Sequence, residues 1–504
     1  MADEESEIRD CTVKGLICGY GQLVGGIVGS ADGEVIGCVN EATVKNTKND
    51  EEDTYTGGIA AISNNGTISD CCNKGTVIGN TAGGIVDTID ENGTVKNCHF
   101  DGSVVSLDGE GSEILGGIAA TNSGNIQNCT VNGEVSGYAT NALGGIVGVM
   151  VQGSVTDCVN EARVENLVSL TGRDGDFSGG IVGTMATGTI RDCCNKGYVS
   201  GNNSGGIVGG AGWAYNEGAR IIRCWNEGAV ENGAGIASTI SGDNVTIKNC
   251  YNVGPVRYGI ISSYAGSGHS VTYCHNVGEL TAGFNHGAPI IPSADDTEIN
   301  VANCYYLADS ESDTIEGTTY KTADQFADGT VLALLNNGHW TQGEDDEYPV
   351  LGDAPGVTVS GMATSFNSET DNVILQLIAE GFSEADYEVF VKGNTAEYSI
   401  EGVVAGTYTM KVMKNNHVTR EYTVTVSTEN VTQDVEIWLL GDVNGDGTIN
   451  AKDKKIIYGH INDSSTELTG YIFDVGDVNG DGAINAKDKK LIFGHISGDS
   501  SLWE

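Results

Sequence analysis

The chain has 504 residues, of which 74 are glycine and only 5 are proline, and its formal net charge at pH 7 is −44. This charge argues against nucleic acid and anionic membrane surfaces as partners, because their phosphate groups would be repelled. No apolar run reaches the roughly 18 residues of a membrane span, and glycine in excess without a G-X-Y period predicts many short strands joined by tight turns.

The first part of the chain repeats a unit such as GGIVGSADGEVIGCVNEATV (25–44), with successive repeat cysteines 24 to 35 residues apart. These cysteines are Cys11, Cys38, Cys71, Cys98, Cys129, Cys158, Cys193, Cys224, Cys250, Cys274 and Cys304. A fixed period of this length predicts a solenoid. Each unit contains three short β-branched runs, so we expect a right-handed parallel β-solenoid with three strands per coil and a triangular cross-section. Because the first unit starts at Cys11, we also expect a signal peptide, and further segments, upstream of Met1.

Two columns of side chains are expected to fill the solenoid, and a third to bind its coils together. The residue three before each repeat cysteine is β-branched from the second coil on, as an inward stack requires: Val35, Ile68, Val95, Ile126, Val155, Ile190, Ile221, Ile247, Val271 and Val301. The cysteines form the second inward column, as free buried thiols rather than metal ligands or redox centres, because one thiol per coil cannot surround an ion. In the doublets Cys71-Cys72 and Cys193-Cys194, one side chain should point in and one out. Two residues after the cysteine, an amide ladder is expected from Asn40, Asn73, Asn160, Asn195, Asn226, Asn252 and Asn276.

The unit GGIVG followed by GxV-x-x-C-x-N-x-G resembles the GLUG-motif repeats of bacterial surface and secreted proteins, over about residues 11–307. That resemblance implies a structural or adhesive role rather than a catalytic one. Residues 322–351 resemble the segment that often closes such arrays, and a helical ADQFADGTVLALLNN would cap the last coil. We therefore assign residues 1–307 to the solenoid and 308–354 to its cap and a linker.

From residue 355 to 440 the pattern changes to about seven longer strands with alternating polarity, which predicts a β-sandwich. The piece SIEGVVAGTYTMKVMKNNHV resembles the carboxypeptidase regulatory-like, transthyretin-type sandwich. The resemblance implies a spacer module, and no chemistry is expected here.

The last 64 residues, 441–504, contain two nearly identical segments, DVNGDGTINAKD (442–453) and DVNGDGAINAKD (477–488). Each has oxygen donors at positions 1, 3, 5, 9 and 12, a main-chain carbonyl at position 7 and glycine at position 6, which is the pattern of a calcium loop. Two Ca²⁺ ions are therefore expected as cofactors. The ligands would be Asp442, Asn444, Asp446, Thr448, Asn450 and Asp453 in the first loop, and Asp477, Asn479, Asp481, Ala483, Asn485 and Asp488 in the second.

Each loop leads directly into an apolar helical segment, KKIIYGHI (454–461) or KKLIFGHI (489–496), and no helix precedes the first loop. A duplicated loop-helix with Asp at position 12 resembles type I dockerin, which implies a small α-helical module that binds a cohesin module of a scaffoldin. The residues that would face the cohesin are Ala451, Lys452, Tyr458, Gly459 and His460 in the first repeat, and Ala486, Lys487, Phe493, Gly494 and His495 in the second. Many cellulosomal dockerins have Ser-Thr where this chain has Ala-Lys, so the cohesin class stays open. Because the Ala-Lys and Gly-His pairs are the same in both halves, either repeat is expected to be able to face the cohesin.

Together these features predict a mostly β, secreted, monomeric, non-catalytic component of a cellulosome-like polysaccharide-degrading assembly, with the solenoid used for adhesion or glycan binding. Aromatic residues directly after the last four repeat cysteines, Trp225, Tyr251, His275 and Tyr305, could form an outward strip that binds a polysaccharide or cell-surface glycan. They could equally pack beneath a loop or the cap. The alternative function is a dockerin-borne lyase or glycoside hydrolase, with its site on the solenoid or in an upstream domain. Acidic residues such as Asp70, Asp157 and Asp192 recur just before repeat cysteines, as features of the repeat rather than as one localised cluster, so the sequence favours the non-catalytic function.

Overall fold

The computed structural model describes the chain except for residues 1–5, 48–53, 108–113, 139–140, 168–175, 214–217, 282–287, 293–298, 310–314, 336–337, 353–355, 367–370, 380–384, 386, 428, 463–466 and 503–504. The chain divides into two compact units. One comprises Met1–Asn336 and Gln342–Leu351, and the other comprises Asn337–Thr341 and Gly352–Glu504. Among the described residues, no helix combines the length and the apolar character needed to cross a membrane.

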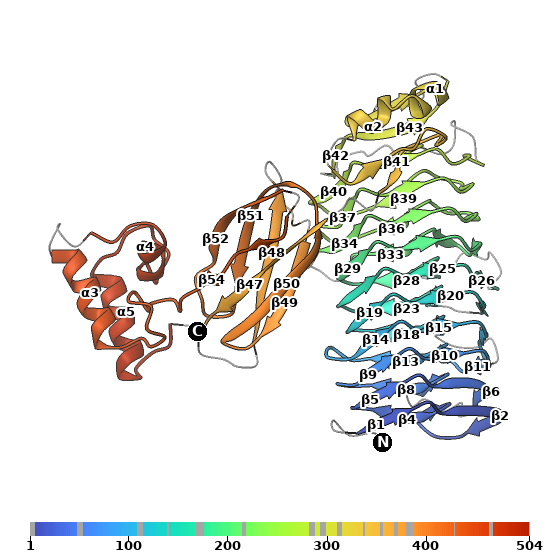
Figure 1. Cartoon of the computed structure of the whole chain (residues 1–504), viewed down its shortest axis with the longest axis horizontal. Coiled ribbons are helices and arrows are strands. Elements are labelled where there is room, and N and C mark those ends of the chain that lie inside the picture. Colours follow the sequence, from blue (N-terminus) through green and yellow to red (C-terminus); the bar gives the residue numbers. More distant parts are fainter. Residues whose placement is uncertain are drawn as a thin grey trace. The chain divides into compact units, whose positions relative to one another are not determined.

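The first unit is a stack of parallel coils whose strands form four long sheets (Figure 1). The first sheet contains β1 (Glu7–Arg9), β5 (Glu34–Ile36), β9 (Thr67–Ser69), β14 (Thr94–Lys96), β19 (Asn125–Gln127), β24 (Ser154–Thr156), β29 (Gly188–Arg191), β34 (Ala219–Ile222), β37 (Thr246–Lys248), β40 (His269–Thr272) and β42 (Ile299–Ala302). The second contains β3 (Leu23–Gly25), β7 (Tyr55–Gly57), β12 (Thr81–Gly83), β17 (Ile114–Gly116), β22 (Ala142–Gly144), β27 (Phe177–Gly179) and β32 (Asn203–Gly205). The third contains β4 (Val28–Ala31), β8 (Ala60–Ser63), β13 (Val86–Ile89), β18 (Ala119–Asn122), β23 (Val147–Met150), β28 (Val182–Met185), β33 (Val208–Ala211), β36 (Ala237–Ile240) and β39 (Ile261–Tyr264).

The fourth sheet lies directly after the repeat cysteines, and most coils contribute two short strands to it. Its strands are β2 (Thr12–Gly19), β6 (Val39–Asn46), β10 (Cys72–Asn73), β11 (Thr76–Ile78), β15 (His99–Phe100), β16 (Ser103–Val105), β20 (Thr130–Val131), β21 (Glu134–Gly137), β25 (Val159–Asn160), β26 (Arg163–Asn166), β30 (Cys194–Asn195), β31 (Val199–Ser200), β35 (Trp225–Asn226), β38 (Tyr251–Asn252), β41 (His275–Asn276), β43 (Cys304–Leu307) and β44 (Thr318–Lys321).

The predicted parallel β-solenoid is confirmed, but the expected three strands per coil are wrong. The GGIVG run does not form one strand, because its glycine pair separates two, as between β3 and β4. A Cβ on Gly25 would lie 1.9 Å from the Val28 carbonyl oxygen, and one on Gly26 would lie 2.0 Å from the Gly58 carbonyl oxygen. Only glycine allows the chain to bend this tightly against itself and against the next coil. The right hand of the coil stays a prediction.

The predicted inward columns are confirmed. Pairing between coils keeps the β-branched residues in register, so that Val35 lies opposite Ile68 and Val155 opposite Ile190. All members of this column are fully buried except Val301, which is half-buried, and the repeat cysteines from Cys38 on are buried beside them. All fourteen cysteines of the chain are free thiols.

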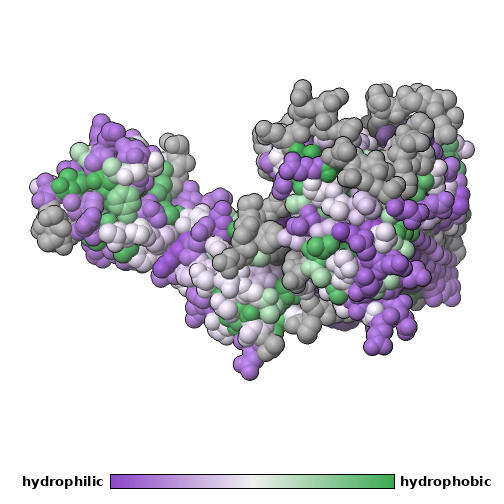
Figure 2. All heavy atoms as spheres, turned by 90° about the horizontal axis from the view of Figure 1, so that it is seen from above, coloured by the Kyte–Doolittle hydropathy of each residue, from purple (hydrophilic) through white to green (hydrophobic). Residues whose placement is uncertain are grey.

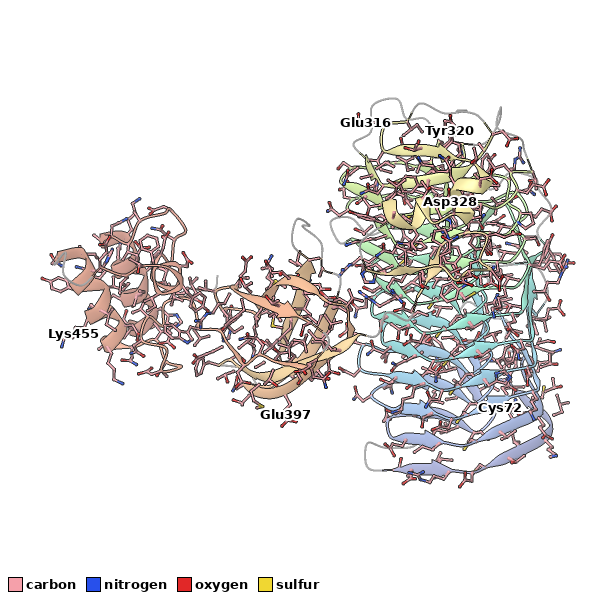
Figure 3. The ribbon with its side chains drawn as sticks, turned by 45° about the horizontal axis from the view of Figure 1, so that its top comes forward. Cys72, Glu316, Tyr320, Asp328, Glu397 and Lys455 are labelled. Carbon is pink, nitrogen blue, oxygen red and sulfur yellow. The ribbon has the colours of Figure 1, made fainter. Side chains whose placement is uncertain are left out.

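In each cysteine doublet one side chain enters the core and the other lies outside it, as expected, but the two outer thiols differ in burial. Cys71 is buried in the core and Cys72 is half-buried on the outside of β10, as expected (Figure 3). Cys194, by contrast, is completely buried although it lies outside the core of the coil. Its Sγ lies 3.8 Å from the carboxylate of Glu227 in the next coil, and its strand pairs with that of Trp225, so neighbouring side chains cover it.

The predicted amide ladder is confirmed and runs in two segments. In the longer one, the Nδ2 of Asn160 donates to Asn195 (2.8 Å), Asn195 to Asn226 (2.7 Å), Asn226 to Asn252 (2.7 Å) and Asn252 to Asn276 (2.8 Å). In the shorter one, Asn40 donates to Asn73 at 2.8 Å. Phe100 and Val131 occupy the two intervening coils and fill the same corner with apolar atoms. Each amide therefore joins its own coil to the next one.

The residue before each repeat cysteine has a left-handed backbone, which explains why Asp and Asn recur there. The φ angles are 55° at Asp70, 54° at Asn97, 51° at Asn128, 54° at Asp157 and 52° at Asp192. Asp and Asn tolerate this conformation better than other residues with a side chain. The recurring carboxylates are therefore corner residues of the solenoid.

The last coil is followed by two short helices, α1 (Ala323–Ala327) and α2 (Thr330–Leu334), as the cap prediction expected. Thr322 and Gln325 form a capping box at the start of α1, in which each side chain bonds the other's main-chain N–H. Phe326 and Val331 are buried beneath the helices. The final Asn336 and Asn337 of the predicted helix lie outside the described residues. This unit also contains β46 (Val350–Leu351).

The second unit begins with β45 (Trp340–Thr341) and continues into a β-sandwich of two sheets. One sheet contains β47 (Val357–Thr364), β50 (Thr395–Val403), β53 (Val431–Thr432) and β54 (Val435–Glu436), and the other contains β48 (Asn372–Ala379), β49 (Tyr387–Lys392), β51 (Gly406–Met413) and β52 (Arg420–Val426). The predicted seventh strand is thus divided into β53 and β54, both of which pair with β47 in parallel.

The chain ends in a small helical module with α3 (Ala451–Asn462), α4 (Tyr471–Gly476) and α5 (Ala486–Ser497). Helices α3 and α5 follow the two oxygen-rich segments, as predicted. The short helix α4 was not predicted from the sequence. It contributes the buried Val475 to a core that Ile457 of α3 and Ile492 of α5 also enter.

Candidate functional site

The first oxygen-rich segment folds into a loop whose two terminal carboxylates point inward. Asp442 accepts hydrogen bonds from the main-chain N–H groups of Asp446 (3.3 Å) and Gly447 (2.7 Å). Asp453, at position 12, accepts from those of Asn444 (3.2 Å) and Asn450 (2.9 Å). The loop is thus held closed around its own carboxylates, and the positive φ of Gly447 (80°) at position 6 makes the turn possible.

The second segment has the same geometry. Asp477 accepts from the N–H groups of Asp481 (3.2 Å) and Gly482 (2.7 Å), and Asp488 accepts from those of Asn479 (3.3 Å) and Asn485 (2.8 Å). The structure therefore folds each loop around its two terminal carboxylates, but among the described residues it does not bring the three predicted aspartates of either loop into one metal-holding group.

The donor set of these loops fits a calcium ion. Asp442, Asp453 and Asp488 have no exposed surface, although a buried carboxylate needs a compensating charge. Burial raises the pKa of Asp442, and the neighbouring Asp453 carboxylate raises it further. No group of three or more His, Cys, Asp or Glu side chains forms a metal-holding cluster in the described parts of the chain, so asparagine and main-chain oxygens would have to complete each set. A ligand set made only of oxygens suits a hard cation such as Ca²⁺.

A lysine of each helix contacts the outermost carboxylate of its loop. The Nζ of Lys452 lies 2.8 Å from Asp446, and the Nζ of Lys487 lies 2.9 Å from Asp481. The hydrogen bond from Lys452 lowers the pKa of Asp446 to about 2. These contacts place a positive charge at position 5 of each loop, where the carboxylate is open to solvent.

Helices α3 and α5 form an open groove of about 620 Å³, lined by Ala451, Lys454, Lys455, Tyr458, Lys489, Lys490 and Phe493. The ammonium of Lys454 lies 3.7 Å from the ring centre of Phe493, and that of Lys489 lies 5.0 Å from the ring centre of Tyr458. These reciprocal cation–π contacts relate the two halves by an approximate twofold axis. Tyr458 is 54% exposed and Phe493 47%, so the groove presents two aromatic rings among four ammonium groups. Lys455 lies on the outer side of α3 (Figure 3), and hydrophobic residues reach the surface of the helical module between hydrophilic ones (Figure 2).

Residues 440–497 match the family described as the dockerin type I domain. The C-terminal module is a type I dockerin. This identity supports a cohesin module as the partner of the chain, as the sequence predicted.

No curated protein matches the chain. Among the solved structures that match part of it are two related complexes. Both are interface mutants of a type II cohesin–X–dockerin complex from Acetivibrio cellulolyticus, one altered at a C-terminal and one at an N-terminal interface. They are 27% and 24% identical to this chain, and each match covers 29% of this chain and 100% of the other. The TM-score is 0.15 in both cases, which does not establish a shared fold.

The structure places most, but not all, of the predicted cohesin-facing residues at the surface of the dockerin. Ala451, Lys452, Ala486 and Lys487 are exposed at the starts of α3 and α5, and Tyr458 and Phe493 lie in the groove. Gly459 and Gly494 are half-buried one residue further along each helix.

The two dockerin histidines have an internal role that the sequence did not predict. The Nδ1 of His460 accepts from the N–H of Leu468 (3.0 Å), and that of His495 accepts from the N–H of Leu502 (3.4 Å). Each histidine therefore holds the segment that follows its helix. Both histidines are half-buried, and their contact with a cohesin stays a prediction.

The aromatic strip on the solenoid is present as a stack but is largely covered. The rings of Trp225 and Tyr251 are parallel with centres 6.0 Å apart, and those of Tyr251 and His275 are 5.0 Å apart. Phe326 and Tyr348 of the cap pack against His275, and His275 donates from Nε2 to the Pro349 carbonyl at 2.8 Å. Tyr251, His275 and Tyr305 are buried, and Trp225 is half-buried. The alternative that these rings pack beneath the cap is thus the one observed, and the burial weighs against glycan binding here.

Proposed function

We propose that this chain is a non-catalytic component of an extracellular cohesin–dockerin assembly, attached to a cohesin through its dockerin when both calcium loops are filled. The type I dockerin match at residues 440–497 is the observation that carries this proposal. Calcium would be held by the Asp, Asn and main-chain oxygens of the two loops. By fixing the loops, it would order the starts of α3 and α5, because each loop runs directly into its helix.

The cohesin would bind across the groove between α3 and α5. The groove concentrates Lys454, Lys455, Lys489 and Lys490 on a chain whose net charge is −44, so an acidic cohesin surface is the complementary partner. The exposed rings of Tyr458 and Phe493 supply the apolar contact that interface centres usually contain.

The solenoid would serve as a rigid display or adhesion element. Its coils are joined by four parallel sheets and by the amide ladder, which supports a structural role. Its recurring acidic residues are left-handed corner residues, so they give no support to a catalytic pair. We also propose that the repeats are GLUG-like, that the sandwich is transthyretin-like and that the solenoid has an adhesion target.

The test measures binding of the full chain to immobilised type I and type II cohesin modules, in calcium and in chelator. We expect binding to at least one cohesin in calcium and none in chelator. The double variant Lys454→Glu/Lys489→Glu should weaken binding at least tenfold, because it reverses two charges in the groove, whereas Lys74→Glu on the solenoid should leave it unchanged. Binding that is equally strong in chelator would overturn the calcium-dependent attachment.

The dual orientation is tested with the Ala-Lys pairs. Replacing only Ala451 and Lys452, or only Ala486 and Lys487, by aspartates should leave cohesin affinity within a few-fold of the original. Replacing all four should abolish binding, because neither half then presents an intact face. Equal and complete loss from each single-pair variant would contradict the dual mode.

The adhesion proposal needs two measurements on the full chain, a glycan array and an assay for released reducing sugar. Binding without release is expected. Release of sugar would instead favour a polysaccharide-active enzyme.

A further inference from the structure

The two calcium loops have the same ligands but different surroundings. Their sequences differ only at position 7, Thr448 against Ala483, where the ligand is a main-chain carbonyl. Their backbones match, with φ angles of 67° and 80° at Gly445 and Gly447, and 66° and 79° at Gly480 and Gly482. Within the loops, the one side-chain difference is that the Thr448 hydroxyl donates to Asp446 at 2.7 Å, whereas Ala483 has no hydroxyl. Any other difference between the two sites must come from what lies outside the loops.

The first loop is packed against two aromatic rings from outside the dockerin repeats. A Cβ on Gly447 would lie 2.5 Å from Cδ1 of Phe366, a sandwich residue that follows β47. A Cβ on Gly445 would lie 2.5 Å from Cε2 of Trp438, which follows β54. Both glycines are half-buried. The second loop has no such support, because a Cβ on Gly480 or Gly482 would meet no atom within 4 Å of the described structure, and both glycines are exposed.

Further contacts fix these two rings in place. The N–H of Phe366 donates to Nε2 of His417 at 3.0 Å. The N–H of Trp438 donates to the hydroxyl of Tyr471 in α4 at 2.8 Å, and that hydroxyl donates to the Val418 carbonyl at 2.9 Å. Arg420 of β52 lies 4.6 Å from the centre of the Tyr471 ring. In the part of the chain that the structure describes, the sandwich and the linker thus support the first loop and not the second.

We propose that Phe366 and Trp438 hold the first loop in its calcium-binding shape, so that the first site binds calcium more tightly than the second and fills before it. A loop that is already ordered loses less conformational freedom when it binds, and calcium affinity depends on the rigidity of the site as well as on its ligands. Phe366 is a positioning residue, because it packs against Gly447, which supplies no ligand oxygen. This inference rests on the proposed calcium binding and extends it to the sandwich, which becomes part of the attachment machinery.

The test compares single-loop variants of the full chain by calcium calorimetry. Asp481→Ala leaves the first loop intact, and Asp446→Ala leaves the second. We expect the Asp481→Ala chain to bind its one calcium about tenfold more tightly than the Asp446→Ala chain does. A roughly tenfold difference in affinity is the size expected for one well-packed contact. Adding Phe366→Ala should weaken binding about tenfold in the Asp481→Ala background and leave the Asp446→Ala background unchanged. The matched control is Phe390→Ala, which removes an exposed sandwich phenylalanine on β49.

Equal affinities of the two single-loop variants, or equal weakening of both by Phe366→Ala, would overturn the inference. Absence of calcium binding in the unaltered chain would instead overturn the proposed function, so the two failures are distinguishable. Should a single-loop variant fail to fold, Tb³⁺ titration of the unaltered chain decides. The Trp438 indole lies against the first loop, so emission sensitised by it should appear with the first equivalent of Tb³⁺ and be lost in Trp438→Phe. Emission that appears only with the second equivalent would refute the filling order.

Discussion

Asp87 in the solenoid is a buried carboxylate whose replacement should stabilise the protein in a pH-dependent way. It lies in β13 with 1% of its surface exposed, at a position where other coils have Gly29, Ala61 or Gly148. It accepts hydrogen bonds from the N–H of Thr56 (2.9 Å) and from the hydroxyl of Thr88 (3.0 Å). Burial raises the pKa of Asp87 from 3.8 to about 7, against the smaller opposite effect of these hydrogen bonds.

The magnitude follows from this pKa difference. A group whose pKa is higher in the folded than in the unfolded chain binds more protons when folded, so stability falls as the pH rises between the two pKa values. A pKa difference of about 3 corresponds to about 4 kcal/mol, which is lost gradually between pH 4 and 7 and stays lost above. In Asp87→Asn the amide oxygen can still accept from Thr56 and the NH₂ can donate to Thr88, so the hydrogen bonds survive while the charge disappears.

The assay is differential scanning calorimetry of the full chain and of Asp87→Asn from pH 4 to pH 8. We expect the variant to melt at the same temperature as the unaltered chain near pH 4 and several degrees higher at pH 8. Other titrating groups affect both proteins equally, so their effects cancel in the difference between the two melting temperatures. A difference in melting temperature that does not change with pH, or a variant less stable at pH 8, would refute the reasoning.

Three further outcomes are expected. Asn195→Ala removes hydrogen bonds to Asn160, Asn226 and Gly197 in the buried ladder, so it should lower the stability of the solenoid by about 3 kcal/mol. The control, Asn125→Ala, alters an exposed asparagine and should change the stability little. Equal effects of the two variants in calorimetry would contradict the role of the ladder. Burial lowers the pKa of His275 from 6.5 to about 4. Its contribution of about 3 kcal/mol to cap stability should therefore be present above pH 6.5 and be lost as the pH falls to 4. Limited proteolysis of the cap at both pH values checks this, with His275→Gln as the pH-insensitive comparison. Chelation of calcium should remove the far-ultraviolet helical signal of α3 and α5 while leaving the β signal, and unchanged helicity in chelator would speak against calcium-ordered helices.

The sequence predicted those features whose signal is periodic or local. The β-branched column and the amide ladder each depend on residue types at fixed spacing, and the structure places them as expected. The two oxygen-rich segments also fold into loops, whereas their calcium binding stays a prediction. The four-sheet coil was missed because a glycine pair permits a sharp bend as well as a strand, and only the packing of neighbouring coils decides between them.

Features that depend on contacts between distant segments could not be predicted. The burial of Asp87 depends on its neighbours in the adjoining coils, and the support of the first loop comes from Phe366, about eighty residues earlier in the chain. The hydrogen bonds that His460 and His495 accept come from segments that return to the helices after them. Only the recurrence of the same Gly-His pair in both repeats could have hinted at this shared internal role.

Because the coils carry a column of buried thiols, chemical labelling of each thiol would show whether its coil has opened. A thiol exchanges or is alkylated only as an accessible thiolate, and burial raises the pKa of Cys193 and Cys194 while the core closes around the column from Cys38 to Cys304. An oxidising medium outside the cell would therefore leave these sulfurs unpaired as long as the coils stay closed. Cys11 and Cys18, which are exposed in the first coil, would react immediately. The order in which the remaining thiols become labelled would then show which coils of the solenoid unfold first.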